Sequence, residues 1–413
     1  MEGRLAALDD TAAARSLLSA AAVRERGHEV LQAGIAGDLA HWTVSLDRLP
    51  SVAAFVASVV RDQYPTLEVP FHARWRHFVV GDRDLWAEAK TPEDRDAKAR
   101  AAFDLAIVSV LLDAGAGMGW RFRDEGTGAE LSRSEGLAIA SFRLFEQGAL
   151  SAGADPLRAD ASSLAGLEKG VLADGFQVSD ANPLIGLDGR AALLRRLGNQ
   201  AEARPDLFAT RDTARPGGLY DAIVARADGR RVPGPLILEV LLEALGPIWE
   251  GRLELGGLPL GDCWRHSAIK RSDASNGLVP LHKLSQWLSY SLVEPLQAAG
   301  YEVSDLDGLT GLAEYRNGGL FFDAGLLALR DPADAGRRHA VGEELVVGWR
   351  AMTVALLDRI APLVREKLGV SASGFPLARV LEGGTWAAGR RLAKQNRSDG
   401  GPPLKIDSDG TVF

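Results

Sequence analysis

The sequence predicts a mainly α-helical fold: a compact, multi-helix globular protein with a few short strands. Of its 413 residues, 46% are hydrophobic and 25% charged, which is ordinary for a globular protein that buries a large core. In several long segments, apolar residues recur at spacings of three and four, the period of an amphipathic helix. Strand signals are few and do not alternate with the helices, so a parallel α/β fold is not expected.

Helix signals in the first half combine apolar runs with capping residues. Thr91 followed by Pro92 predicts a helix start, and this helix should end at the stop formed by Gly115–Gly117. Asp188 should cap another helix, which runs through Leu197. Two further helices are expected at 52–60 and 134–145.

The second half carries the longest helical patterns. Leucines spaced by three and four from Leu281 to Leu296 predict a helix over 278–299. Further helices are expected at 236–245, 335–368 and 379–394, and short strands at 41–46, 78–80, 120–123 and 404–413. Loops 201–217 and 267–277 are the candidate breaks. We expect an N-terminal helical lobe over 1–200 and a C-terminal helical lobe over 201–413, or a single compact domain.

Charge and cysteine content narrow the class of protein. Lys and Arg total 47 and Asp and Glu 55, a net charge of −8, so a nucleic-acid-binding surface is not expected. The single cysteine, Cys263, cannot form an internal disulfide. No apolar run reaches the roughly 20 residues of a membrane span, and Asp9 and Asp10 do not fit a signal peptide. These features predict a cytoplasmic protein that binds neither nucleic acid nor membrane.

Three clusters concentrate residues that suit a small charged ligand: the first at 70–78, the second at 256–266 and 281–287, and the third at 305–319. In the first, guanidinium groups that pair with phosphate alternate with rings that stack on planar groups. The second combines glycine-rich turns with a helix start, and the third gathers carboxylates between apolar residues, where desolvation raises a pKa and favours proton transfer. The candidate binding residues are Arg74, Trp75, Arg76, His77, Trp264, His266, His282, Lys283, Gln286, Tyr315, Arg316 and Asn317. The candidate catalytic carboxylates are Glu314, Asp307 and Asp262.

Each cluster also has an interpretation without function. Trp75 could simply be a buried core residue, and His282 could belong to a solvated N-terminal turn. Asp307 could cap a helix, and Glu314 could form a surface pair with Arg316. On one helix, Asp307 and Glu314 would face the same way. The sequence contains no phosphate-binding glycine loop and no set of residues with metal-ligand spacing, so we expect no metal and no organic cofactor. Cys263 is a weaker nucleophile candidate than the carboxylates.

The clusters together resemble the uracil-catabolism URC-four family. The motifs that carry this resemblance span most of the chain: 70–78, 103–105, 109–117, 134–138, 261–266, 282–288, 309–319, 381–390 and 408–413. The resemblance implies a role in a uracil-degrading pathway that proceeds through a ribosylurea-type intermediate and yields urea. It does not assign a reaction.

A second, shorter resemblance suggests a reaction. The motif Ala313–Arg316, the pair Lys283 and Gln286, and Trp386 followed by Ala387 are similar, in the same order, to motifs of the queuosine-nucleotide nucleosidase family. That family is helical and similar to DNA glycosylases, which implies a DNA-glycosylase-like helical core. Glu314 stands where that family has aspartate.

These observations predict an N-ribosyl hydrolase that releases urea from ribosylurea or its 5-phosphate. Glu314 would act as base or cation stabiliser, with Asp307 and Asp262 as helpers. Arginines and Lys283 would bind phosphate, and Trp75, Trp264 and Tyr315 would line the pocket. Two alternatives remain open: a protein that only binds or channels an intermediate, docking to another uracil-degradation enzyme, and an enzyme that acts earlier, on a uridine nucleotide.

Overall fold

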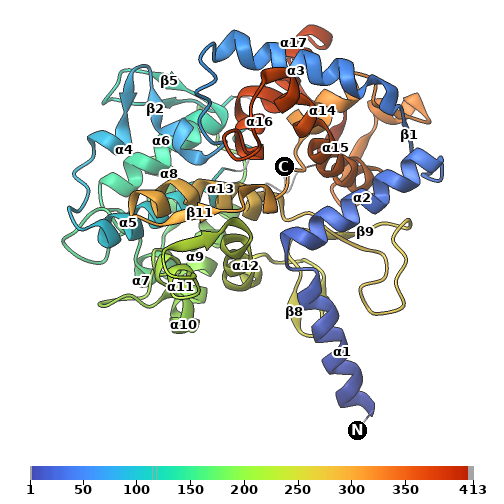
Figure 1. Cartoon of the computed structure of the whole chain (residues 1–413). Coiled ribbons are helices and arrows are strands. Elements are labelled where there is room, and N and C mark those ends of the chain that lie inside the picture. The colour runs from blue at the N-terminus through green and yellow to red at the C-terminus, as the bar shows by residue number, and fades with distance from the viewer. Residues whose placement is uncertain (1, 114, 118, 408–413) are drawn as a thin grey trace. The chain divides into compact units, whose positions relative to one another are not determined.

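A computed structural model describes residues 2–113, 115–117 and 119–407, and the fold is mainly α-helical, as predicted (Figure 1). The strands are two or three residues long and pair in twos. The chain forms two compact units, each assembled from separated segments. The first unit consists of Met1–His72, Gly251–Gln286 and Asp305–Phe413, and the second of Ala73–Glu250 and Trp287–Ser304.

This division differs from the expected lobes 1–200 and 201–413. Residue 200 lies inside helix α9 (Leu187–Ala203), where the chain has no break. The first unit needs segments from both ends of the chain, and the second takes its last strand from beyond residue 300. The DNA-glycosylase-like core implied by the second resemblance stays a prediction.

The first unit is organised around α15 (Glu344–Leu368), a 25-residue helix buried on most of its surface. It packs against α2 (Ala20–Ala36), α3 (Leu49–Gln63) and α14 (Tyr315–Asp323). Gly27 lets α2 approach closely, because a Cβ at this position would lie 2.9 Å from the carbonyl oxygen of Ala351. Helix α3 also packs against the π-helix η6 (Leu381–Trp386) and α17 (Ala387–Asn396), and Figure 1 shows α17 beside α3.

The remaining elements of the first unit are short. Its helical segments are α1 (Glu2–Ser16), η1 (Leu46–Arg48), η4 (Leu306–Gly308), η5 (Pro332–Gly336), α16 (Leu377–Val380), the π-helix η6 (Leu381–Trp386) and α17 (Ala387–Asn396). Its antiparallel strand pairs are β1 (Trp42–Val44) with β12 (Leu327–Leu329), β7 (Glu254–Leu255) with β8 (Leu258–Pro259), and β9 (Cys263–Arg265) with β10 (Leu278–Pro280). Strands β13 (Arg338–Ala340) and β14 (Lys405–Asp407) pair in parallel.

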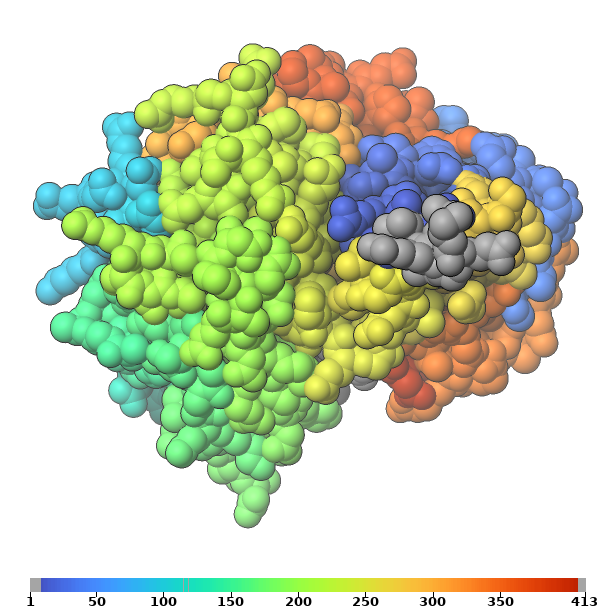
Figure 2. All heavy atoms as spheres, turned by 90° about the horizontal axis from the view of Figure 1, so that it is seen from below, coloured from blue at the N-terminus to red at the C-terminus, as the bar shows by residue number. Residues whose placement is uncertain are grey.

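A small apolar cluster joins the N-terminal helix to the middle segment of the first unit. Ala14 and Leu17 are buried against Leu260, Cys263 and Leu278. Figure 2 shows the middle segment, in yellow, against the blue N-terminal segment. This packing holds the β9–β10 pair, which precedes the start of α13 (Lys283–Ala298), in place.

In the second unit, α5 (Arg95–Leu111) is the most buried helix and packs against α6 (Arg133–Glu146), α9 and α11 (Gly218–Val224). The other helical segments are η2 (Arg74–Phe78), α4 (Leu85–Glu88), α7 (Ala161–Ala165), α8 (Lys169–Gly175), α10 (Pro205–Phe208), α12 (Gly234–Leu245), η3 (Gly246–Ile248) and the remainder of α13. The strand pairs are β2 (Val79–Val80) with β3 (Arg83–Asp84), β4 (Phe122–Arg123) with β5 (Glu130–Leu131), and β6 (Arg231–Pro233) with β11 (Glu302–Ser304).

Most predicted helices are confirmed, but several boundaries were wrong. The helix predicted from Thr91 begins at Arg95 and is capped by Asp94, whose carboxylate accepts the N–H of Ala97. The N-cap of α9 is Gly186, not Asp188. The helix predicted over 278–299 begins only at Lys283, because Leu278–Pro280 pairs as β10 with a strand that local periodicity did not reveal.

The helix predicted over 335–368 begins at Glu344, because residues 338–340 form β13. The strand predicted over 404–413 is found at Lys405–Asp407, and the motif at 408–413 lies outside the described residues. None of the described helices combines the length and the hydropathy needed to cross a membrane.

Candidate active site around Glu314

Glu314 is the N-cap of helix α14. One carboxylate oxygen accepts the backbone N–H of Arg316 at 2.6 Å and the other accepts the N–H of Asn317 at 2.5 Å. The residue is 8% exposed. The surface pair with Arg316 that the sequence left open is therefore wrong, since both residues are buried. Glu314 and Asp307 also do not share a helix, because Asp307 belongs to η4 and α14 begins after Glu314.

The surroundings of Glu314 set its protonation behaviour. Burial raises the pKa of this carboxyl group above its ordinary value. The two backbone N–H groups and the charges of Lys283 and His72 act in the opposite direction but do not cancel the effect of burial. Glu314 is therefore a buried carboxylate held by a helix N-terminus, with a raised pKa that suits it to accept a proton.

His72 is paired with a second carboxylate in the same unit. Its Nδ1 lies 2.6 Å from Oε2 of Glu382, and its ring centroid lies 6.1 Å from that of Trp386. Glu382 and Trp386 belong to the π-helix η6, a rare conformation that is frequent at functional sites. Lys283 and Glu382 are half-buried, and we call His72, Lys283, Glu314 and Glu382 the carboxylate cluster.

Asn317 and Arg316 lie in the first turn of α14 beside this cluster. Asn317 is fully buried. Arg316 donates from Nη1 to the carbonyl oxygen of Gly400 at 2.7 Å, and its guanidinium lies 4.8 Å from the ring centroid of Tyr315, which is half-buried. Both Arg316 and Asn317 are therefore near Glu314, and their role in substrate binding stays a prediction.

Asp262 is fully engaged by protein groups. Arg350 pairs with both carboxylate oxygens at 2.8 and 2.7 Å, and Nε1 of Trp264 and the backbone N–H of Lys283 also donate to them. Burial alone would raise the pKa of Asp262, but Arg350 and the other donors outweigh it and hold the pKa well below its usual value. This geometry makes Asp262 a structural anion that fixes the start of α13.

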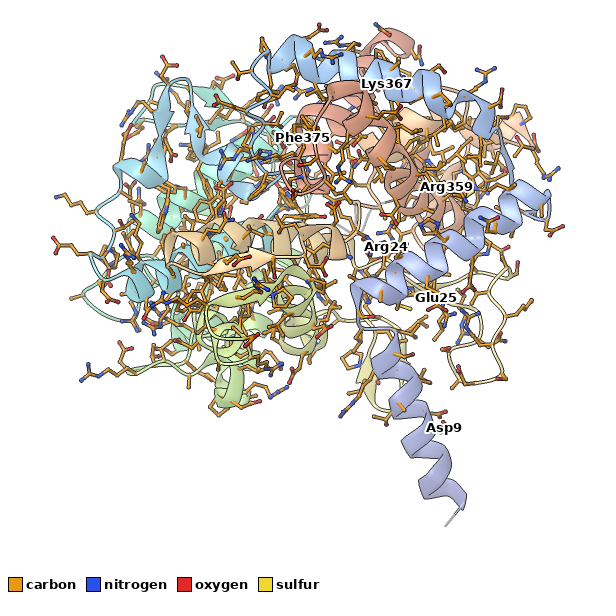
Figure 3. All side chains as sticks on the ribbon, viewed as in Figure 1. Asp9, Arg24, Glu25, Arg359, Lys367 and Phe375 are labelled. Carbon is orange, nitrogen blue, oxygen red and sulfur yellow. The ribbon has the colours of Figure 1, made fainter. Side chains whose placement is uncertain are left out.

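Asp307 also anchors neighbouring elements. Its carboxylate pairs with Arg365 at 2.6 Å and accepts the N–H of Leu377 at 2.7 Å. Its carbonyl oxygen accepts a hydrogen bond from Arg24, which Figure 3 labels on α2. The side chain is 38% exposed. Asp307 thus joins η4 to α15, α16 and α2, and its catalytic role stays a prediction.

The other candidates of the second cluster occupy folding roles. Gln286 is fully buried and donates to Oγ1 of Thr310 at 2.8 Å, while its Oε1 accepts the Thr310 N–H. His282 adopts a left-handed conformation with φ of 45° and contacts the carbonyl oxygen of Leu17. Nδ1 of His266 accepts the N–H of Ala268. Burial lowers the pKa of both histidines, so each favours the neutral form.

The arginine- and tryptophan-rich first cluster lies in the second unit, on η2. Arg74 is fully buried, 3.0 Å from Asp113, with its Nε donating to Oγ of Ser109. Nε1 of Trp75 donates to the carbonyl oxygen of Ser291. Arg76 pairs with Glu294 at 2.6 Å, and His77 stands edge-on to Trp287. Each of these residues contacts its own unit, and their role in phosphate or base binding stays a prediction.

Cys263 is buried, and burial together with the charge of Asp262 raises the pKa of its thiol far above the usual range. A thiol that resists ionisation is a poor nucleophile. Among the described residues, no three His, Cys, Asp or Glu side chains gather in a way that could hold a metal ion.

Sequence reasoning missed Glu382 as a site residue and did not commit to His72. Glu382 lies 68 positions beyond Glu314, and a π-helix has no clear sequence signature. The one available signal was the run of two glycines and a tryptophan after Glu382, Gly383–Trp386, which looked like an ordinary helix interior.

Comparisons with known proteins agree with this chain-wide pattern of motifs. Residues 16–413 match a family profile described as "Protein of unknown function (DUF1688)". The chain is 38% identical over 414 residues to "Protein urg3" of Schizosaccharomyces pombe, covering 96% of this chain and 98% of that protein. It is 36% identical over 415 residues to "Uracil catabolism protein 4" of Lachancea kluyveri, covering 90% and 92% respectively.

Proposed function

The chain belongs to the DUF1688 family, and from that premise we propose that it acts in uracil catabolism as an N-ribosyl hydrolase. The printed name of the Lachancea kluyveri relative supports the pathway. The buried Glu314 carboxylate at the start of α14 is the observation that carries the reaction. The proposed substrate is ribosylurea or its 5-phosphate, and the products are urea and ribose or ribose 5-phosphate.

The reaction needs one base and one proton donor. Hydrolysis breaks the bond between C1 of the ribose and the ureido nitrogen, and a water oxygen bonds to C1. The water loses a proton, and the leaving urea nitrogen gains one, so the reaction balances without a redox partner. The transition state resembles an oxocarbenium ion, and a nearby carboxylate stabilises that positive charge.

Glu314 suits the part of base and cation stabiliser. Its raised pKa makes the carboxylate a better proton acceptor than an exposed glutamate. The two backbone N–H donors fix its orientation before substrate arrives. Each carboxylate oxygen retains a further lone pair for water or for the developing cation.

His72, in contact with Glu382, suits the role of proton donor. The His72 ring is oriented by its contact with the Glu382 carboxylate, at 2.6 Å from Nδ1 to Oε2. The charge of His72 acts on the Glu314 carboxyl group, which supports assigning both residues to one site. The proton would pass to the urea nitrogen as the bond to C1 breaks.

Urea release from ribosylurea and from its 5-phosphate tests the proposal. We expect native protein to release urea and the Glu314→Gln variant to lose about 10²–10⁴-fold in rate, the usual contribution of general acid–base catalysis. Glu314→Asp is the second variant: aspartate is a good N-cap, so it should fold normally while the shorter carboxylate lowers the rate.

The same urea-release assay also tests the alternative that the protein only binds an intermediate. That alternative is favoured by the capping role of Glu314, which would explain the buried carboxylate without catalysis. Native protein that binds both compounds but releases no urea would support it. Urea release unchanged in Glu314→Gln would rule out Glu314 as the catalytic carboxylate.

A further inference from the structure

We propose that the Asn317 side chain recognises the ureido group of the substrate through a paired hydrogen bond. This inference rests on the proposed function and adds a specificity-determining residue to it. Asn317 is 0% exposed, and neither its Nδ2 nor its Oδ1 has a hydrogen-bond partner among the described residues. A buried carboxamide with both ends unpaired is unfavourable for folding, because desolvation removes its bonds to water.

Gln286, in the same unit, is a buried amide whose hydrogen bonds are made to the protein itself. It is equally buried, yet its nitrogen and its oxygen both bond to Thr310. The Gln286 amide therefore stabilises the fold through its contacts. The Asn317 carboxamide has no hydrogen-bond partner in the part of the chain that the structure describes, so its amide is better explained by a ligand that pairs with it.

The position of Asn317 connects it to the proposed chemistry. It is the third residue of α14, whose N-cap is Glu314. Its own backbone N–H donates to the Glu314 carboxylate. A group bound by the Asn317 carboxamide therefore lies within about one helical turn of the proposed base.

The hydrogen-bond donors and acceptor of a ureido group are complementary to those of the Asn317 carboxamide. The carboxamide offers N–H donors and a carbonyl acceptor side by side, and so does the ureido group. Nδ2 would donate to the ureido carbonyl oxygen, while a ureido N–H would donate to Oδ1. The first of these bonds also stabilises the charge that gathers on the urea as the bond to C1 breaks. The ligand class is thus an N-ribosyl compound with a free ureido N–H.

Two measurements on the full chain test this inference. The first is the melting temperature of Asn317→Leu, an apolar substitution of similar shape, beside Gln286→Leu. Replacing an unpaired buried amide should leave the melting temperature unchanged or raise it, whereas removing the paired amide of Gln286 should lower it. If the melting temperature of Asn317→Leu falls as far as that of Gln286→Leu, the Asn317 amide has a folding role and the inference is opposed.

The second measurement is calorimetric binding of ribosylurea in the Glu314→Gln background, which separates binding from turnover. Asn317→Leu should weaken binding about tenfold or more, the loss expected for two hydrogen bonds. Asn317→Asp, which keeps the shape but loses the N–H donors, should also weaken it and serves if the leucine variant does not fold. Tetramethylurea, which has no N–H group, should compete less well than urea. Affinity for ribosylurea that is the same with and without Asn317 overturns the inference.

The two proposals can fail separately. Hydrolysis of ribosylurea with unchanged affinity in Asn317→Leu would reject only the role of Asn317. Binding that depends on Asn317, without any urea release by native protein, would reject only the hydrolase.

Discussion

At the scale of single residues, environment decides what each carboxylate can do. Asp262 and Glu314 are both acidic residues with little exposed surface, and the carboxylate of each accepts a backbone N–H at the start of a helix. Asp262 faces the guanidinium of Arg350, and its pKa falls. The Glu314 carboxylate accepts the backbone N–H groups of Arg316 and Asn317, which do not outweigh burial, so its pKa rises. The first environment suits a structural ion pair and the second a proton acceptor.

The Asp262–Arg350 pair should be important for stability. In Asp262→Asn, Arg350 keeps a buried charge without its anionic partner, which we expect to cost about 3–5 kcal/mol. Asp307→Asn is the matched control, because its carboxylate is 38% exposed and its loss should cost much less. Guanidinium unfolding at pH 7 measures both. Similar losses for the two variants would contradict the structural role given to Asp262.

The same pair also predicts a pH dependence. Because the folded pKa of Asp262 is depressed, its contribution to stability is fully present above the unfolded pKa of about 4. It is lost as pH falls through the lower, folded pKa. The stability difference between native protein and Asp262→Asn should therefore shrink when unfolding is measured at pH 3 instead of pH 7. An undiminished difference at pH 3 would contradict this assignment.

At the scale of elements, caps and close crossings define the helices. Asp94, not Thr91, accepts a backbone hydrogen bond at the start of α5. Asp94→Ala should therefore lower the free energy of unfolding by about 1 kcal/mol, the usual loss for an N-cap, while Thr91→Ala should have little effect. Thermal unfolding of the two variants side by side checks this. A larger loss for Thr91→Ala would favour the helix start first predicted from the sequence.

Two glycines of α9 should respond in opposite ways to alanine. At Gly198 a Cβ would lie 2.2 Å from the backbone nitrogen of Ala165 on α7, so Gly198→Ala should destabilise by about 1–3 kcal/mol or more. At Gly189 a Cβ meets nothing within 4 Å, and Gly189→Ala should stabilise the helix by about 0.5–1 kcal/mol. Chemical denaturation gives both values. Equal effects would mean that the α7–α9 crossing is looser than described.

At the scale of the whole molecule, the two units take segments from distant parts of the chain. Fragments 1–200 and 201–413 each lack part of both units. Expressed separately, neither should unfold cooperatively or show a near-ultraviolet circular dichroism signal like that of the full chain. A 1–200 fragment with a sharp thermal transition would instead support the lobe division suggested by the sequence.

The sequence by itself determined the fold class and most helices, and it singled out the segments of the candidate site. Apolar periodicity reports burial on one helix face, so α3, α6, α12 and α15 were recognisable without their partners. The third cluster was singled out because carboxylates and an amide among apolar residues are unusual wherever they occur, and its residues 315–317 form the first turn of α14.

Only the tertiary structure decided which of these polar residues share an environment. The pairing of His72 with Glu382 spans 310 positions, and that of Asp262 with Arg350 spans 88. The strand β10 exists only because it pairs with β9. Such contacts depend on chain segments that meet after folding, so no local pattern could distinguish the carboxylate of lowered pKa at Asp262 from the carboxyl group of raised pKa at Glu314.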